Sequence, residues 1–156
     1  MAKENKFYLT KDGLVKIEKE YKKLKELRRL KLEKEAPLVL HSEELSTESL
    51  VWREDMGILD SRIAELEYTL KNFQLIKTPP EKERDKINLG THVELEVDGQ
   101  KDEFIIVGTL EANPSLGKIS NESPVGKALM NHKVGDEIVI SSPIKTLYKI
   151  KKIKYE

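Results

Sequence analysis

The sequence predicts an α+β protein in which a long antiparallel helical hairpin precedes a small antiparallel sheet domain with one short helix. Two apolar repeats with steps of three and four residues predict the hairpin, because this spacing places a stripe of side chains along one face of each helix. Downstream, alternation with a period of two and hairpin turn signals predict the strands. We expect helices over about 11–36 and 46–76, a tip over about 37–49, and a domain boundary near residue 80.

The first predicted helix begins with Thr10 as a candidate N-cap, followed by Asp12 near the positive end of the helix dipole. Its apolar stripe slips after Leu24 by a three-residue stammer, which would distort the supercoil locally; the stripe contains Leu14, Ile17, Tyr21, Leu24, Leu27 and Leu30. We expect Pro37 to end this helix, because proline disfavours the α conformation in the residue before it.

The second predicted helix carries the strongest repeat of the chain. Its apolar residues alternate in steps of four and three, and most positions between them are charged or polar; they are Trp52, Met56, Leu59, Ile63, Leu66, Leu70 and Phe73. At about 1.5 Å of rise per residue, such a helix is roughly 45 Å long. A helix of this length with one apolar stripe needs a partner, and the first helix is the partner we expect.

Basic residues dominate the first helix, and those nearest the tip are Arg28, Arg29, Lys31 and Lys34. One interpretation is a solvated surface with ion pairs between residues i and i+4. The other is a basic stripe that faces nucleic acid, since lysine and arginine neutralise phosphates. The sequence leaves both open.

The predicted tip combines three apolar residues over 38–40 with the carboxylates of Glu43, Glu44 and Glu48. A tip far from any core has no packing reason for either feature, so both suit insertion into another molecule. The alternative for the glutamates is a solvated position at the start of a helix.

The sheet domain is predicted from a strand over 93–97, the turn signal Asp98-Gly99 and a return strand over 104–107. Further strands are expected over 118–120, 137–140 and 147–155, the last with a bulge at Lys151-Lys152. Ser123 is the expected N-cap of the short helix, with Pro124 at its first position.

Composition excludes several classes of protein. There are no cysteines, which excludes disulfides and thiolate metal sites, and 28 basic residues balance 28 acidic ones. No apolar run is long enough for a membrane span or a leader, so we expect a cytoplasmic protein. The histidines His41, His92 and His132 lack metal-ligand spacing, and no phosphate-binding glycine motif is present. We therefore expect that the chain is not an enzyme in its own right.

Ordered motifs run through nearly the whole chain. They are Leu9-Thr10-x-x-Gly13, Arg28-Arg29, Ser61-Arg62-Ile63-x-x-Leu66-Glu67, Ile106-Val107-Gly108 with Glu111, Ile119-Ser120-x-x-Ser123-Pro124, Gly135-Asp136-x-Ile138-x-Ile140 and Tyr148-x-Ile150. In this order and register, the chain resembles the bacterial GreA/GreB-type transcript-cleavage factors. The resemblance implies a coiled-coil finger over 1–80 and an FKBP-like docking domain over 81–156.

The resemblance also implies bacterial RNA polymerase as the partner of a monomeric protein with no cofactor of its own. The globular domain would dock at the rim of the secondary channel through Ser123, Pro124 and Asp136. The finger would reach the catalytic Mg²⁺ of the polymerase, with its basic stripe near the RNA 3′ end. Tip carboxylates would then help to hold a second Mg²⁺, so that the polymerase cleaves its own backtracked RNA.

The tip departs from the family motif Gly-Asp-Leu-x-Glu-Asn-Ala-Glu-Tyr, which this chain lacks. Alignment from the first helix places the essential aspartate on Glu44, whereas alignment from the second places it on Ser42, so the tip is two residues shorter. Glu44 is the candidate acid that faces the metal, and Glu43 and Glu48 are candidate second acids.

Three functions are compatible with these observations. The first is a factor that stimulates cleavage through Glu44, and the second is a homologue that occupies the channel as an inhibitor or non-cleaving regulator because the tip is altered. The third is a prolyl isomerase based on the FKBP-like domain. That activity needs an aromatic cage, for which the domain offers only Phe104, Tyr148 and Tyr155.

Overall fold

The computed structural model describes residues 6–35, 47–141 and 144–155. They form two compact units: a helical unit within 14–72, and a globular unit that combines 1–13 with 73–156. Pro37, Glu43 and Glu44 lie outside the described residues. The functional division of the chain near residue 80 stays a prediction.

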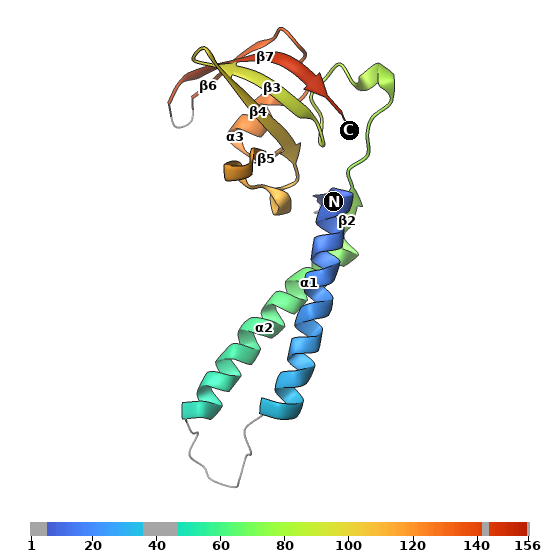
Figure 1. The fold of residues 1–156 in the computed structure, drawn as a ribbon, viewed down its shortest axis with the longest axis vertical. Coiled ribbons are helices and arrows are strands. Elements are labelled where there is room, and N and C mark those ends of the chain that lie inside the picture. The colour runs from blue at the N-terminus through green and yellow to red at the C-terminus, as the bar shows by residue number, and fades with distance from the viewer. Residues whose placement is uncertain (1–5, 36–46, 142–143, 156) are drawn as a thin grey trace, which may run out of the picture. The chain divides into compact units, whose positions relative to one another are not determined.

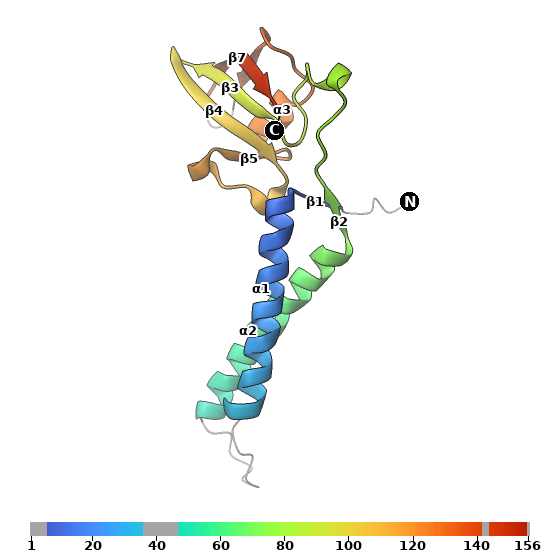
Figure 2. The same ribbon diagram turned by 45° about the vertical axis from the view of Figure 1, so that its right-hand side comes forward.

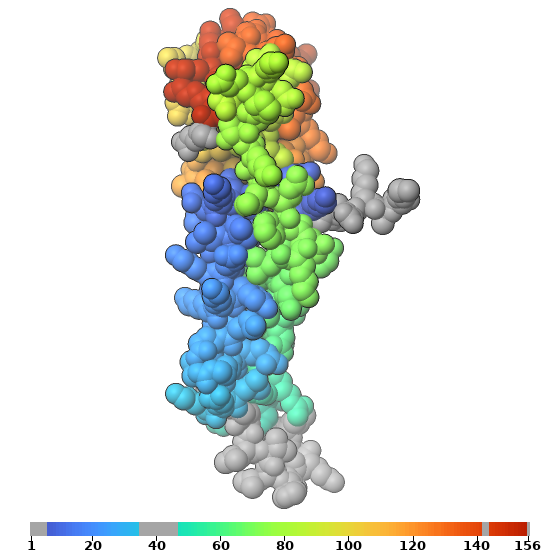
Figure 3. All heavy atoms as spheres, turned by 90° about the vertical axis from the view of Figure 1, so that its right-hand side faces the viewer, coloured from blue at the N-terminus to red at the C-terminus, as the bar shows by residue number. Residues whose placement is uncertain are grey.

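The helical unit consists of α1 (Lys11–Leu30) and α2 (Thr47–Lys71), and α1 continues into a π-helical turn at Lys31–Glu35 (Figure 1). Two ion pairs cross between the helices, Arg28–Asp60 and Arg62–Glu20. The later α1 residue, Arg28, pairs with Asp60, and the earlier one, Glu20, pairs with Arg62 further along α2, so the helices run antiparallel. Figures 2 and 3 show them side by side in two further views. The predicted hairpin is confirmed.

The seam between the helices contains the predicted residues, with one exception. Met56, Leu59 and Leu66 are buried, and the α1 residues Leu14 to Leu24 of the stripe are half-buried. Leu27, expected in the seam, is 41% exposed. The stammer explains this correction, because a three-residue step rotates Leu27 away from the line of the preceding residues. The π-helical turn follows directly after Leu30.

The second helix ends five residues earlier than expected. After Lys71, residues Phe73–Leu75 form strand β2, which pairs in parallel with β1 (Phe7–Leu9). The pairing is extended by a hydrogen bond from the amide of Ile76 to the carbonyl of Leu9, at 2.8 Å. Phe73 continued the helical spacing, and a three-residue strand is too short to show an alternation of its own, so the periodicity misassigned this segment.

The globular unit contains a five-stranded sheet in the order β5-β4-β3-β7-β6. Its strands are β3 (His92–Val97), β4 (Gln100–Val107), β5 (Lys118–Ser120), β6 (Glu137–Ile140) and β7 (Thr146–Lys154). Neighbouring strands are antiparallel except β4 and β5, which are parallel. The predicted antiparallel sheet with one helix is confirmed, and the parallel pairing of β5 is a feature that the sequence did not indicate. Two short 3₁₀ turns between β4 and β5 let the chain cross back before it pairs.

Local sequence signals in this sheet are confirmed. Asp98 and Gly99 both have positive φ, 52° and 80°, as a tight hairpin between β3 and β4 requires. The register between β3 and β7 shifts between Glu94 and Leu95, which leaves Lys151 as the extra residue of a bulge.

The hydrophobic core lies on one face of the sheet. It is built from buried residues of β3, β4, β6 and β7 together with Ile87 and Leu129. Leu129 belongs to α3 (Pro124–Leu129), so this helix covers the inner face. The outer face carries the charged residues of the alternating strands.

Candidate functional site

Of the three tip acids, the structure describes Glu48, an exposed residue in the first turn of α2. This is the favourable position for a carboxylate at the positive end of a helix dipole. Within the described ranges, no group of three or more His, Cys, Asp or Glu side chains could hold a metal ion. A Mg²⁺ site at the tip that uses Glu44, Glu43 and Glu48 stays a proposal.

The two arginines of the basic stripe are engaged in ion pairs. Arg28 Nε lies 2.6 Å from Asp60 on α2, and Arg29 binds Glu26 at 2.5 Å and Glu33 at 2.9 Å on its own helix. The hydrogen bonds that Arg29 donates to Glu26 and Glu33 raise the pKa of its guanidinium, and the bond to Glu26 lowers the pKa of that carboxyl. The contacts of Arg29 correspond to the solvated, paired surface that the sequence left open as one interpretation.

A role of the stripe in RNA binding stays a proposal. If the stripe binds RNA, a phosphate has to compete with the carboxylates that pair with Arg28 and Arg29. Exposed ion pairs contribute little to stability. A phosphate group could therefore replace the carboxylates around Arg29 at small energetic cost. Lys34 is exposed on the π-helical turn, and Lys31 is half-buried there.

The predicted docking residues lie around α3 and the turn before β6. Ser123 Oγ accepts a hydrogen bond from the amide of Gly126 at 3.0 Å and donates one to the carbonyl of Ser120 at 2.7 Å. It is thus the N-cap of α3, and the exposed Pro124 occupies the first helical position. A Cβ atom at Gly126 would overlap the carbonyl of Ser120, so this position of α3 has room only for glycine.

Asp136 stabilises the turn before β6. Its carboxylate accepts hydrogen bonds from the amide of Lys133 at 2.9 Å and from Nδ1 of His132 at 3.1 Å. The Lys133 bond and then the His132 bond lower the pKa of the Asp136 carboxyl. Ser123 and Asp136 thus each have a structural task, and their contact with polymerase stays a proposal.

Sequence reasoning missed the contact made by Glu111. Its Oε2 accepts a hydrogen bond from the amide of Thr10 at 2.7 Å, and its Oε1 accepts one from the Thr10 hydroxyl at 2.6 Å. Thr10 Oγ1 in turn accepts a bond from the amide of Gly13 at 3.0 Å, which confirms Thr10 as the N-cap of α1. The available signal was Gly13 itself, because a glycine in the first turn of a helix costs helix propensity unless space requires it.

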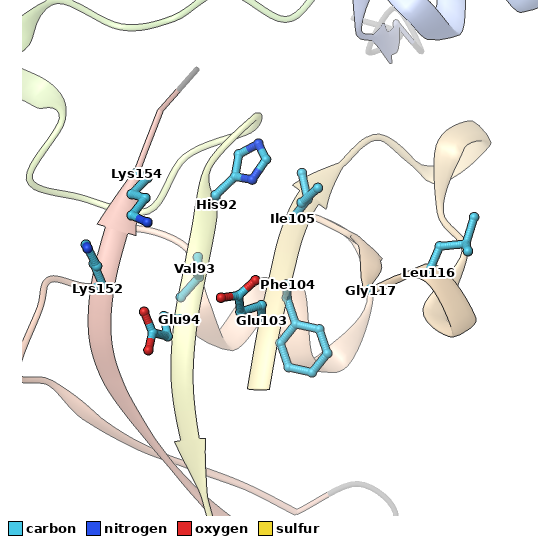
Figure 4. A pocket seen from close by; sticks show the side chains of 10 residues that line it. All are labelled: His92, Val93, Glu94, Glu103, Phe104, Ile105, Leu116, Gly117, Lys152 and Lys154. Atoms are coloured by element: carbon cyan, nitrogen blue, oxygen red, sulfur yellow. The ribbon is translucent and has the colours of Figure 1, made fainter. Parts of the chain in front are cut away.

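A shallow hollow of about 190 Å³ lies beside β3, β4 and β7 (Figure 4). Across the strands, Lys154 stands opposite His92, while Glu94 stands opposite both Lys152 and Glu103. Two lysines of β7 therefore lie beside two neighbouring glutamates of β3 and β4. Because the side chains around the hollow carry both charges, the hollow favours neither an anion nor a cation. Its lining residues also form no pair of nucleophile and base.

Considering the described part of the chain, we find no helix with both the length and the apolar character that a membrane span needs.

Comparison with known proteins places this geometry in a family. Residues 81–155 match the family model described as transcription elongation factor GreA/GreB, C-terminal. The chain is 36% identical over 152 residues to transcription elongation factor GreA of Thermomicrobium roseum, covering 94% of this chain and 95% of that protein. It is 39% identical over 148 residues to GreA of Clostridium acetobutylicum, covering 92% of each. Among solved structures, GreA factor homolog 1 of Thermus thermophilus is similar, with 26% identity, 96% and 99% coverage and a TM-score of 0.42.

Proposed function

The chain belongs to the GreA/GreB family of transcription elongation factors, and from this premise we propose that it stimulates RNA cleavage by backtracked bacterial RNA polymerase. The observation that carries the proposal is the extent of the similarity to GreA, which includes both the helical hairpin and the globular unit. The hairpin supplies a long, narrow element that ends in acidic residues, and the globular unit supplies a separate surface for docking.

In the proposed mechanism, the protein supplies charge and position and the polymerase supplies the chemistry. The surface around α3 and Asp136 binds the rim of the secondary channel, and the hairpin enters the channel. Glu44, with Glu43 or Glu48, would hold a second Mg²⁺ near the RNA phosphate, since Mg²⁺ binds through one or two carboxylates together with phosphate oxygens. Such an ion would activate water and neutralise charge on the phosphate.

A second candidate function rests on one specific observation. The chain lacks the family's tip motif, and its tip is two residues shorter by the disagreement between the two helix alignments. Metal sites of this kind tolerate little misplacement, since a displacement of about 1 Å can cost roughly 10²-fold in rate. A factor with a displaced acid would occupy the channel and slow transcription without cleavage.

One experiment separates the two functions. The protein is added to a stalled, backtracked elongation complex of the cognate polymerase with RNA labelled at its 5′ end. Shortened labelled RNA that can be extended again after nucleotide addition supports cleavage. Slower elongation with RNA of unchanged length supports the inhibitor, and no effect on either would contradict both functions.

A further inference from the structure

We infer that Glu111 is a positioning residue that fixes the N-cap and first turn of α1 within the globular unit, which is the unit that docks on polymerase in the proposed function. The consequence for transcription rests on the proposed function. The contact itself rests on the hydrogen bonds of Glu111, and the two can be tested separately.

Both oxygens of the Glu111 carboxylate take part in this contact. Each of its oxygens accepts one hydrogen bond from Thr10, from the amide and from the hydroxyl. The hydroxyl also accepts a hydrogen bond from the amide of Gly13. The Glu111 carboxylate therefore orients both the amide and the hydroxyl of the residue that caps α1. A negative charge at this end of the 20-residue helix α1 is also favoured by the helix dipole.

Two glycines make the approach possible. A Cβ atom at Gly13 would overlap the carboxylate of Glu111, and one at Gly108 would overlap the backbone carbonyl of Tyr8. Between these points Leu9 is fully buried. The chain from Tyr8 to Gly13 is therefore fitted closely to the turn at 108–111, and Glu111 makes its polar contact at the residue where α1 begins.

This contact lies at the place where both helices of the hairpin begin or end. Strand β1 leads into α1, α2 leads into β2, and the two strands pair with each other. The hydrogen bonds of the proposed docking residues Ser123 and Asp136 do not involve Glu111. Loss of the Glu111 carboxylate should therefore loosen the start of α1 and leave docking intact.

The first test compares Glu111→Ala and Glu111→Gln in the full chain, with Glu83→Ala as control, since Glu83 is an exposed carboxylate of the same unit. Amide hydrogen exchange of Thr10 and Gly13 should be about fivefold faster in Glu111→Ala, as for loss of a helix cap. The exchange should be intermediate in Glu111→Gln, which retains an acceptor oxygen. Both rates should be unchanged in the control.

The second test measures cleavage in a backtracked elongation complex as a function of protein concentration. For Glu111→Ala, the half-saturating concentration should stay within about twofold, while the cleavage rate at saturation falls about fivefold or more, by the same loss of the cap. Glu111→Gln should recover part of that rate. A simple loss of folded protein would instead change the half-saturating concentration alone.

The third test uses the overlap with Gly13. In the wild-type background, Gly13→Ala should displace the carboxylate and accelerate exchange of the Thr10 amide. In the Glu111→Ala background the same change should slow exchange, because alanine is the better helix former. Equal effects of Gly13→Ala in both backgrounds, or unchanged exchange in Glu111→Ala, would overturn the inference. If wild type binds polymerase without cleavage, the proposed function fails, and the exchange rates still decide the role of Glu111.

Discussion

Arg62 of α2 donates two hydrogen bonds to the carboxylate of Glu20 on α1, from Nε at 2.8 Å and from Nη2 at 3.1 Å. Both oxygens are used, which fixes the orientation of the guanidinium as well as its distance. With Glu65 as a further partner, these bonds raise the pKa of Arg62. The hairpin is thus joined across its surface by a directed pair in addition to its apolar seam.

We predict that Arg62→Lys loses most of this contribution, because an ammonium group cannot form the two parallel bonds. The side chains are about half exposed, so the free energy of unfolding should fall by only about 0.5–1 kcal/mol. Chemical denaturation at low and high salt checks this. The difference between the variant and wild type should shrink at high salt, where exposed charges are screened. A difference that is independent of salt would assign the loss to packing of the arginine stem.

The seam should respond to truncation in proportion to burial. Leu66 is 3% exposed, so Leu66→Ala should lower the free energy of unfolding by about 2–4 kcal/mol. Ile63 is half-buried, and Ile63→Ala should cost less than Leu66→Ala. The control is Ile58→Ala on the same helix, where the side chain is 65% exposed. Urea denaturation of the three variants gives the order, and a loss in Ile58→Ala as large as in Leu66→Ala would contradict the seam.

Asp136 offers a prediction on pH. Its folded-state pKa is lowered below the ordinary 3.8, first by the Lys133 amide and then by His132. A carboxylate of this kind stabilises the folded state above its unfolded pKa, and the stabilisation is lost as the pH falls through the folded value. Wild type should therefore lose more stability than Asp136→Asn between about pH 5 and pH 3. Thermal denaturation across this range checks the sign.

The same variant tests docking at neutral pH. If Asp136 also contacts polymerase, Asp136→Asn should compete with labelled wild type at least about tenfold less well, as for loss of a charged hydrogen bond. Its thermal midpoint would then fall only slightly. Glu137→Gln in the next residue is the matched control, with a carboxylate that pairs with Lys149. Equal competition by Asp136→Asn and wild type would show that Asp136 stabilises the turn and does not contact polymerase.

The basic stripe is best tested in two halves. Arg28 and Arg29 have carboxylate partners on the helices, and Lys34 is an exposed residue of the π-helical turn that follows α1. Replacing Lys31 and Lys34 by alanine should weaken crosslinking to the RNA 3′ end at low salt. Replacing Arg28 and Arg29 should weaken it and also lower hairpin stability, because the cross-helix pair to Asp60 is lost. If the double lysine variant crosslinks as strongly as wild type at low salt, Lys31 and Lys34 are solvated surface residues that do not contact the RNA.

Sequence reasoning succeeded where the cause of a structure is local. The three-four spacing, the Asp98-Gly99 turn, the bulge at Lys151 and the Ser123 cap each depend on neighbouring residues, and each was confirmed. It failed for β2, for the parallel pairing of β5 and for the contact of Glu111 with Thr10. These depend on partners far along the chain: Thr10 and Glu111 are 101 residues apart. The tip could be aligned from either helix, and the two alignments disagree by two residues because no local pattern fixes the loop.

The tip acids carry the most specific prediction. Glu44→Gln keeps the size of the side chain and removes the charge that would attract a second Mg²⁺. If the protein stimulates cleavage, the rate should fall by more than about 100-fold, because residues that only support metal ligands already cost about 10–100-fold. Polymerase binding, measured by competition, should hardly change, and higher Mg²⁺ should restore part of the rate. The exposed Glu48 provides the comparison, since Glu48→Gln should have a smaller effect if Glu44 is the principal ligand. If Glu44→Gln, Glu43→Gln and Glu48→Gln all cleave RNA at the wild-type rate, the metal site is contradicted. If wild type is inactive and insertion of Asp-Leu-Ser-Glu-Asn at the tip produces cleavage, the shortened tip is identified as the cause.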